Sequence, residues 1–299
     1  MGKLIFIILM ALPLWVYPQG IAITVDDVPN KQLQENGEPA LLKIFQQKNV
    51  PVAIFINEKP IYNRESLSFL EHWISDTLVT VGNHTYSHRR YSAVGLQNYV
   101  NEIVMGEKFT RTMAEDYDKE LKYFRPPYND LGDNARAHEQ LQYVLDTMGY
   151  LMTPYTVESS DWLYNAIYKA RLSDNDVEGA WEIGQMYVAQ TMKVLNYIEG
   201  ILKAVQQRPV NHIYLCHDNE INRAFLPEII DKFRNSGYQL ISLEEALCDP
   251  MYLQPDHYTG KWGISWAYRW ILDELTRKQV MQNEPHDTRA QFFYEQLGN

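Results

Sequence analysis

Short apolar runs alternate with longer amphipathic stretches along most of the chain. The runs are only a few residues long, which is typical of buried parallel strands, whereas the stretches repeat apolar residues at helical spacing. The predicted strands cover residues 21–25, 52–56, 78–81, 123–124, 151–156, 213–216 and 238–241. The predicted helices cover residues 38–48, 64–75, 96–113, 134–148, 174–207 and 225–235. This alternation predicts an α/β fold in which a parallel sheet closes, or nearly closes, into a barrel.

The first apolar run ends at two adjacent carboxylates, Asp26 and Asp27. A buried strand that leads into a functional loop has this pattern, and so does a plain acidic turn. The later predicted strands also end at polar side chains, which are Asn57, His84 with His88, Arg125, Glu158 with Asp161, and His217 with Asp218. Because the loops at the carboxyl ends of barrel strands meet at one rim, we expect these side chains to share a pocket.

Residues 249–299 follow a different pattern, with tyrosines and tryptophans crowded before a helix that runs through Thr276. We interpret this segment as a helical and aromatic C-terminal extension packed on the barrel. Contact with sugar is the alternative, since the apolar face of a sugar ring stacks on aromatic side chains.

The N-terminus resembles a secretory signal peptide. Lys3 precedes an apolar run from Leu4 to Val16, which is shorter than the ~20 apolar residues that span a bilayer. The residues before Ile21 lack the small-residue pattern of a cleavage site, so an uncleaved anchor is the alternative. We therefore expect a signal peptide at 1–19, a barrel domain at 20–248, and export to the periplasm, the cell envelope or the medium. No stable membrane insertion is expected after removal of the signal.

Composition narrows the classes of partner. The formal net charge is -11, and no stretch combines clustered basic residues with aromatic ones, which argues against nucleic acid as a partner. Cys216 and Cys248 are the only cysteines, so there is no disulfide framework. The sequence leaves open whether these two form a single bridge.

His84 and His88 are separated by the length of one helical turn, which would place both imidazoles on one face. Two histidines and a carboxylate from another strand end would make three protein ligands and leave a position for water. This is the pattern of a catalytic metal site, and a second carboxylate beside it would serve as the base.

Five segments in order carry a family resemblance: Thr24-Val25-Asp26-Asp27, His84-Thr85-Tyr86-Ser87-His88, Arg125-Pro126-Pro127-Tyr128, Glu158-Ser159-Ser160-Asp161-Trp162 and Leu215-Cys216-His217. Together they resemble the motifs of the polysaccharide deacetylases, the NodB-homology proteins of carbohydrate esterase family 4. The resemblance covers residues 21–247 and implies a distorted seven-stranded (β/α) barrel. It also implies metal-dependent removal of acetyl groups from a glycan, N-acetyl groups in preference to O-acetyl groups.

The resemblance assigns roles to the first three motifs. Asp27, His84 and His88 would hold one divalent ion, expected to be zinc, with cobalt, nickel and manganese as alternatives. Asp26 would act as the general base, and Arg125 would pair with it and fix its orientation.

Further roles follow for the remaining motifs. His217 would act as the general acid, and Glu158 stands where the family has an aspartate that orients that histidine. The backbone N–H of Tyr128 would stabilise the oxyanion. Asp161 and Trp162 would contact substrate, or else form a helix cap and a core position.

Three residues depart from the family pattern. Val28 and Asn129 replace glycines, and Glu158 is one methylene longer than aspartate. The altered glycines and the aromatic C-terminal segment leave a glycan-binding pseudoenzyme as one alternative function. The resemblance leaves a second, an amidase that acts on a small non-carbohydrate amide, as some relatives do without a metal, although those relatives lack the full ligand set present here.

Overall fold

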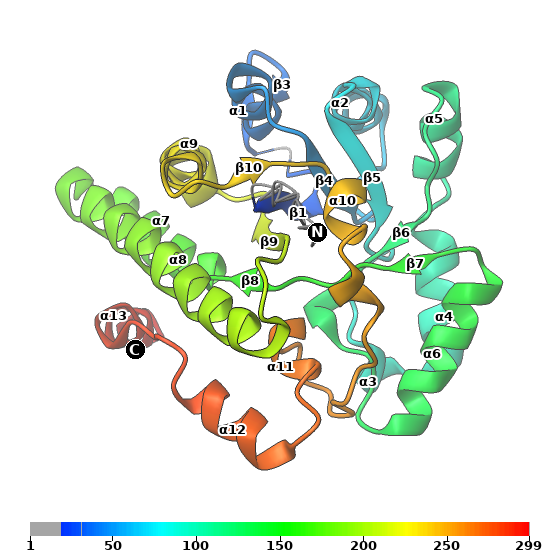
Figure 1. Ribbon diagram of the computed structural model, residues 1–299. Coiled ribbons are helices and arrows are strands. Elements are labelled where there is room, and N and C mark those ends of the chain that lie inside the picture. Colours follow the sequence, from blue (N-terminus) through cyan, green and yellow to red (C-terminus); the bar gives the residue numbers. More distant parts are fainter. Residues whose placement is uncertain (1–18, 31, 299) are drawn as a thin grey trace, which may run out of the picture.

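A curled sheet of parallel strands lies at the centre of the molecule, with helices around it (Figure 1). The computed structural model describes residues 19–30 and 32–298. The strands of this sheet are β1 (Gly20–Val28), β4 (Val52–Ile56), β5 (Val79–Asn83), β6 (Tyr123–Phe124), β7 (Leu151–Met152), β8 (Val157–Glu158), β9 (His212–His217) and β10 (Gln239–Leu240). They pair in the order β7-β6-β5-β4-β1-β9-β8, and β10 also pairs with β1. A separate pair, β2 (Gln34–Glu35) and β3 (Glu38–Pro39), is antiparallel.

Helices follow most of the strands, as parallel connections require. They are α1 (Ala40–Lys48), α2 (Arg64–Ser75), α3 (Tyr91–Val94), α4 (Leu96–Met105), α5 (Thr110–Asp116), α6 (Ala135–Thr147), α7 (Asp161–Ser173), α8 (Val177–Gln206), α9 (Glu220–Asn235), α10 (Leu243–Leu247), α11 (Trp266–Arg269), α12 (Glu274–Gln282) and α13 (Thr288–Gln296). Two short 3₁₀ turns, η1 (Pro127–Asn129) and η2 (Pro250–Leu253), complete the set.

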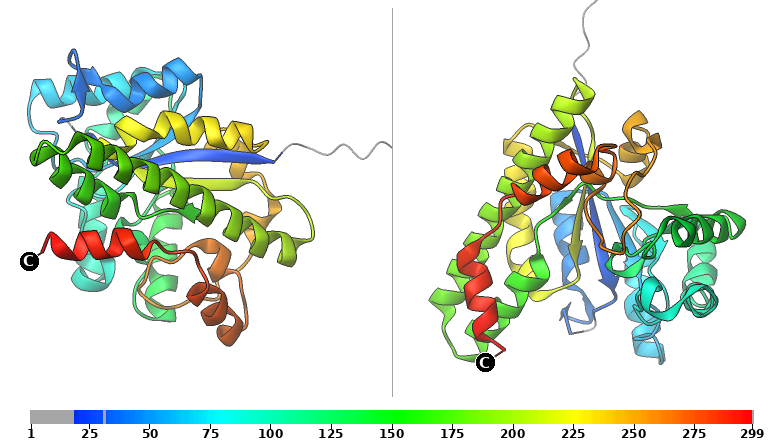
Figure 2. Two further views of the ribbon diagram at one scale, coloured as in Figure 1. Left: turned by 90° about the vertical axis from the view of Figure 1, so that its left-hand side faces the viewer. Right: turned by 90° about the horizontal axis from the view of Figure 1, so that it is seen from below.

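Strand β1 is the middle of the sheet and carries the acid pair. Its apolar residues are buried, because β4 and β9 pair with it on either side and helices cover the sheet (Figure 2). The strand does not stop at the carboxylates, as the prediction for 21–25 had it, but continues to Val28. The pairing with β4 shifts register between Val25 and Val28, and Asp27 has φ 64°. This irregularity turns the Asp27 side chain away from the regular alternation of the strand.

The alternation of strands and helices is confirmed, and its errors have local causes. The predicted helix at 96–113 is two helices, α4 and α5, with Gly106 after the first. Of the predicted strand at 151–156 only Leu151–Met152 (β7) is a strand, and the next strand, β8, begins after it at Val157. The residues between β7 and β8 cross from the β6 side of the sheet to the β9 side. The prediction missed α7, which buries few apolar side chains and therefore has a weak helical pattern.

The C-terminal segment packs where the path of the sheet ends. Strands β7 and β8 are the two ends of the hydrogen-bonded order. At the chain that joins them, the Ser265 hydroxyl donates to the Thr156 carbonyl at 2.6 Å, and the Trp266 N–H donates to the Tyr155 carbonyl at 3.0 Å. Further along, α13 packs on α7 (Figures 1 and 2).

The structure tests only some of the predictions about the N-terminus and the cysteines. The predicted signal peptide lies outside the described residues except for Gln19. Within the described ranges, no helix has the length and hydropathy needed to cross a bilayer. Cys216 and Cys248 are both free thiols, so the bridge that the sequence left open is not formed.

Candidate active site

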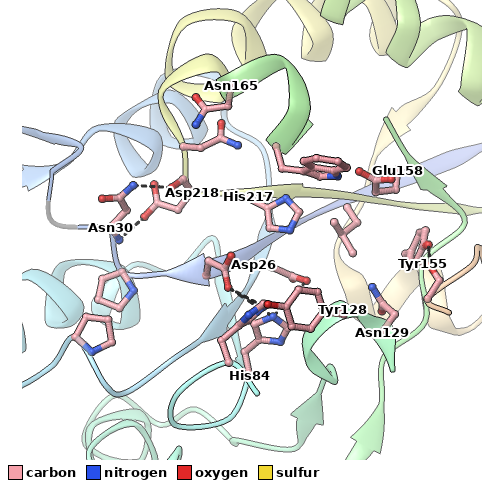
Figure 3. Close-up of a pocket in the computed structure, with 18 of the residues that line it drawn as sticks. Asp26, Asn30, His84, Tyr128, Asn129, Tyr155, Glu158, Asn165, His217 and Asp218 are labelled. Atoms are coloured by element: carbon pink, nitrogen blue, oxygen red, sulfur yellow. Dashed lines mark hydrogen bonds and ion pairs between the residues drawn. The ribbon is translucent and has the colours of Figure 1, made fainter. Parts of the chain in front are cut away.

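The polar strand ends meet in one groove of about 1040 Å³ (Figure 3). Most of the predicted site residues line it, namely Asp26, Asp27, His84, His88, Tyr128, Glu158, Trp162 and His217. Arg125 and Asp161 are almost fully buried and lie behind the groove, where each contacts a residue that lines it. The sequence therefore identified a set of side chains that the fold brings together.

Asp27, His84 and His88 form a compact group of ligand atoms. The Asp27 Oδ1 atom lies 3.7 Å from His84 Nε2 and 3.4 Å from His88 Nε2. One potential ligand atom from each residue lies within 4.8 Å of the others. Two imidazole nitrogens and a carboxylate oxygen are a donor set that zinc and similar divalent ions accept.

Three observations show that this group fits a cation. Asp27 Oδ1 is buried and has no hydrogen-bond partner. Nothing offsets the loss of water around this oxygen, and a bound ion would do so. The His84 Nδ1 atom is 2.6 Å from the Arg125 carbonyl oxygen, and since that oxygen only accepts, Nδ1 carries the proton and Nε2 presents its lone pair. Burial is the main reason that the pKa values of His84 and His88 are lowered to about 4, which keeps both rings neutral.

The two histidines do not lie on a helix, so that part of the sequence interpretation is wrong. They belong to a loop after β5 in which Thr85 and His88 have φ 68° and φ 58°. The Asn83 side chain accepts a hydrogen bond from the Thr85 N–H at 2.7 Å and shapes the first turn of this loop. The loop reverses direction and brings the two rings to a centroid distance of 5.1 Å.

Asp26 is held by Arg125 beside the three ligands. The Arg125 Nη1 atom donates to Asp26 Oδ1 at 2.8 Å and to the Thr24 hydroxyl at 2.7 Å. The guanidinium also donates to backbone carbonyls of the chain between β7 and β8 and lies 4.3 Å from the centre of the Phe55 ring. Because Arg125 is fully buried and held by several partners, it fixes the orientation of the Asp26 carboxylate.

Asp161, rather than Glu158, holds the candidate acid. The His217 Nδ1 atom lies 2.7 Å from Asp161 Oδ1, and the His217 backbone N–H donates to Asp161 Oδ2 at 2.7 Å. Asn219 and Asn222 donate their side-chain N–H groups to the same carboxylate. Burial alone would lower the pKa of His217, but the charge and hydrogen bond of Asp161 raise it to about 10. The imidazole is therefore protonated at neutral pH.

Glu158 points elsewhere, which corrects the role that the resemblance implied for it. Its Oε1 atom accepts from the Ser160 backbone N–H at 2.6 Å, and no hydrogen bond joins it to His217 among the residues described. Burial and then the nearby Asp161 raise the pKa of Glu158 to about 7.

Trp162 is 51% exposed and lines the groove, so it is not a core position.

The remaining predicted and missed residues shape the rim. The Tyr128 ring lies 4.5 Å from the His88 ring, and the Arg90 guanidinium carbon lies 3.8 Å from its centre on the same wall. Asp218, which the sequence marked only as the neighbour of His217, accepts from the Asn30 backbone N–H at 2.8 Å. This bond ties the loop after β1 to the loop after β9, a contact that no local pattern could indicate.

Comparison with known proteins gives matches to one family. The model of the polysaccharide deacetylase family matches residues 17–145. A peptidoglycan-N-acetylglucosamine deacetylase of Bacillus cereus is 27% identical over 142 residues, which are 48% of this chain and 46% of that relative. The chain therefore spans about half the length of this curated relative.

Solved structures resemble the fold over most of the chain. A peptidoglycan N-acetylglucosamine deacetylase, solved in a complex, has a TM-score of 0.54 at 20% identity, over 77% of this chain and 89% of its own. A CE4 family pseudoenzyme of Bacillus anthracis has a TM-score of 0.52 at 16% identity, over 78% of this chain and 66% of its own. At such identities these likenesses show the fold alone, and they confirm the barrel that the sequence predicted.

Proposed function

We propose that the chain is a polysaccharide deacetylase, as the family model that matches residues 17–145 suggests, and that it hydrolyses N-acetyl groups of a glycan with the help of one divalent metal ion. One observation carries this proposal: three ligand side chains, a carboxylate held by a buried arginine and a protonated histidine line the same groove. These groups provide the ligands, the base and the acid that metal-assisted amide hydrolysis needs.

Asp27, His84 and His88 would hold the ion. A zinc ion or a similar divalent ion supplies Lewis-acid chemistry, which makes a water more acidic and polarises a carbonyl. His84 is suited to this role because the Arg125 carbonyl fixes its tautomer, as partners behind metal ligands commonly do.

Asp26 would take the proton of the attacking water. Its Oδ1 atom is occupied by Arg125, while Oδ2 points toward the ligand group and lies 3.8 Å from His84 Nε2. The arginine therefore leaves one oxygen of the carboxylate available at the reacting centre. The contact between Arg125 Nη1 and Asp26 Oδ1 is short and buried on both sides, so it holds the carboxylate in this orientation.

His217 would give its proton to the leaving nitrogen. Asp161 holds the Nδ1 side of the ring, so the other nitrogen is the one that can face the groove. An amine is a poor leaving group unless it is protonated as the C–N bond breaks, which makes a protonated histidine more useful for an amide than for an ester. This difference favours an N-acetyl group over an O-acetyl group.

The substrate class rests on the relatives and on the surface of the groove. The curated relative is a peptidoglycan-N-acetylglucosamine deacetylase, and an exposed tryptophan, Trp162, offers a flat face to a sugar ring. The signal-like N-terminus suits a substrate outside the cytoplasm. A glycan-binding pseudoenzyme and a small-amide amidase are less well supported, because all three ligands, the base and the acid are present together.

Acetate release tests the proposal. We expect the purified protein to release acetate from chitin oligomers or peptidoglycan, and to release less from acetylxylan. Treatment with a chelator should abolish the activity, and addition of zinc, cobalt, nickel or manganese should restore it. Full activity after complete removal of metal, measured by elemental analysis, would contradict metal dependence. If the metal-loaded protein releases no acetate from any of these substrates, the result would favour the pseudoenzyme.

Two substitutions separate the base from the ligands. Asp26→Asn should bind metal normally and lower kcat by about 10²- to 10⁴-fold, the usual contribution of a positioned general base. His84→Ala should lose both metal and activity, because it removes one of three ligands. Metal content and acetate release, measured on the same samples, distinguish the two effects. An Asp26→Asn variant with wild-type kcat would rule out Asp26 as the base.

A further inference from the structure

The C-terminal extension contacts the exposed tryptophan of the groove. Trp162 lies at the start of α7, next to the residue that holds the candidate acid, and half of its surface is exposed. The ring of Tyr294, from α13, packs against it edge to face, with a centroid distance of 5.5 Å and an interplanar angle of 88°. Such a contact restricts the tilt of both rings.

Helix α13 is fixed in place by polar contacts to α7 and α8. Asp287 caps α13 by accepting from the Arg289 and Ala290 N–H groups, and its other oxygen accepts from the Tyr164 hydroxyl of α7 at 3.1 Å. Arg289 pairs with Glu182 of α8 at 3.2 Å. Ala290 is buried against this surface. These contacts hold α13, and with it Tyr294, against α7 and α8.

The extension contacts the groove at a second place as well. Gly263 lines the groove, and its carbonyl accepts a short hydrogen bond from the Tyr155 hydroxyl. Two separate parts of the extension, at Gly263 and at Tyr294, thus each contact a residue that lines the groove.

We propose that Tyr294 is a positioning residue that holds Trp162 as a stacking platform for a second sugar ring, beyond the ring that carries the acetyl group. The proposal rests on the function proposed above and goes further by assigning a subsite to the extension. A tryptophan that is held at one tilt loses little side-chain entropy when a sugar stacks on it, so the support of Tyr294 increases affinity for longer glycans.

Binding of chitin oligomers tests the platform independently of acetate release. Dissociation constants for N-acetylglucosamine, which has one ring, and for chitohexaose are measured by calorimetry in the Asp26→Asn background, so that hydrolysis does not alter the ligand. Tyr294→Ala should weaken chitohexaose binding roughly 3- to 10-fold, the usual contribution of one aromatic contact, and change N-acetylglucosamine binding little, because a single ring does not reach the platform. Tyr294→Phe should bind as the parent does, because the ring and not the hydroxyl makes the contact.

Phe292→Ala is the matched control, since Phe292 lies on the same helix, is 57% exposed and makes no ring contact with Trp162 among the described residues. It should bind both ligands as the parent does. The proposal is overturned if Tyr294→Ala binds chitohexaose as the parent does, if it weakens the binding of chitohexaose and N-acetylglucosamine equally, or if the parent binds neither ligand. Acetate release by the wild-type protein, measured separately, tests the deacetylase function, so the two failures are distinguishable.

Discussion

The pairing of Asp161 with His217 decides how the candidate acid works. Asp161 accepts hydrogen bonds from the His217 ring, from its backbone N–H and from two asparagine side chains. Burial would raise the pKa of Asp161, but the charge of His217 and these hydrogen bonds lower it. The pair is thus a carboxylate and an imidazolium, and the carboxylate keeps the acid protonated.

The sequence located His217 but not its partner. Glu158 and Asp161 are only three residues apart, and either could have oriented the ring. Ser160 between them has φ 56°, so the chain turns before α7 begins, and the two carboxylates point in different directions. A serine does not predict this left-handed conformation, because glycine and asparagine adopt it more readily.

Asp161→Asn should change the pH dependence of the reaction. The pKa of His217 is about 10 with the carboxylate present, so the acid stays protonated up to alkaline pH. Without the negative charge, the pKa of His217 falls, and activity should decline at a pH about one to three units lower than in the wild type. The measurement is kcat/KM for acetate release across the pH range, compared with Asp146→Asn, which removes an exposed carboxylate on α6. An unchanged alkaline limb would show that His217 is not the acid.

At the scale of elements, helix α4 holds the loop that carries the two histidine ligands. The Glu102 carboxylate accepts from the Ser87 N–H at 2.7 Å and from its hydroxyl at 2.8 Å, and the Glu102 carbonyl accepts from the Tyr86 N–H at 2.9 Å. The helix ends just beyond, at Gly106. The apolar pattern continues through this glycine, which is why the sequence predicted one helix. Contacts between a helix end and a distant loop produce no periodic pattern in the sequence, so they could not be predicted from it.

Gly106→Ala should weaken metal binding. A Cβ atom at this position would lie 2.4 Å from the Thr85 carbonyl carbon and 2.7 Å from the Tyr86 nitrogen, so the loop must move. Displacing support behind metal ligands typically costs about 10- to 100-fold in affinity. The measurement is competition of the metal-loaded protein with a calibrated chelator, together with a urea unfolding curve. Gly200→Ala is the control, because that position on α8 is open and the change should leave metal affinity intact. Equal affinity in both variants would mean that the loop does not set the ligand geometry.

For the whole molecule, alternation in the sequence was enough to predict the curled sheet, because each buried strand depends on its own apolar run. The motifs at the strand ends then predicted the groove, since parallel strands bring their carboxyl ends to one rim. The packing of the extension could not be predicted in this way. Its contacts, such as Ser265 with Thr156 and Gly263 with Tyr155, join positions more than 100 residues apart and follow no repeat.

Gly263→Ala tests whether the extension and the groove act as one unit. A Cβ atom at this position would lie 2.0 Å from the Tyr128 carbonyl oxygen and 2.8 Å from the Asn129 Cβ, so either the η1 turn or the extension must shift. We expect a loss of stability of about 1–3 kcal/mol from overpacking, measured by urea unfolding. We also expect kcat/KM for acetate release to fall about 10- to 100-fold, since small displacements at a reacting centre have effects of this size.

Leu272→Ala is the comparison for this last prediction, because Leu272 belongs to the same extension and is 75% exposed. It should leave both stability and kcat/KM near the wild-type values. If Gly263→Ala loses stability but keeps full activity, the extension is the part that shifts, and the groove does not depend on the position of the extension. If activity falls by more than the small population of unfolded protein explains, the η1 turn is the part that moves, and the extension belongs to the structure that positions the substrate.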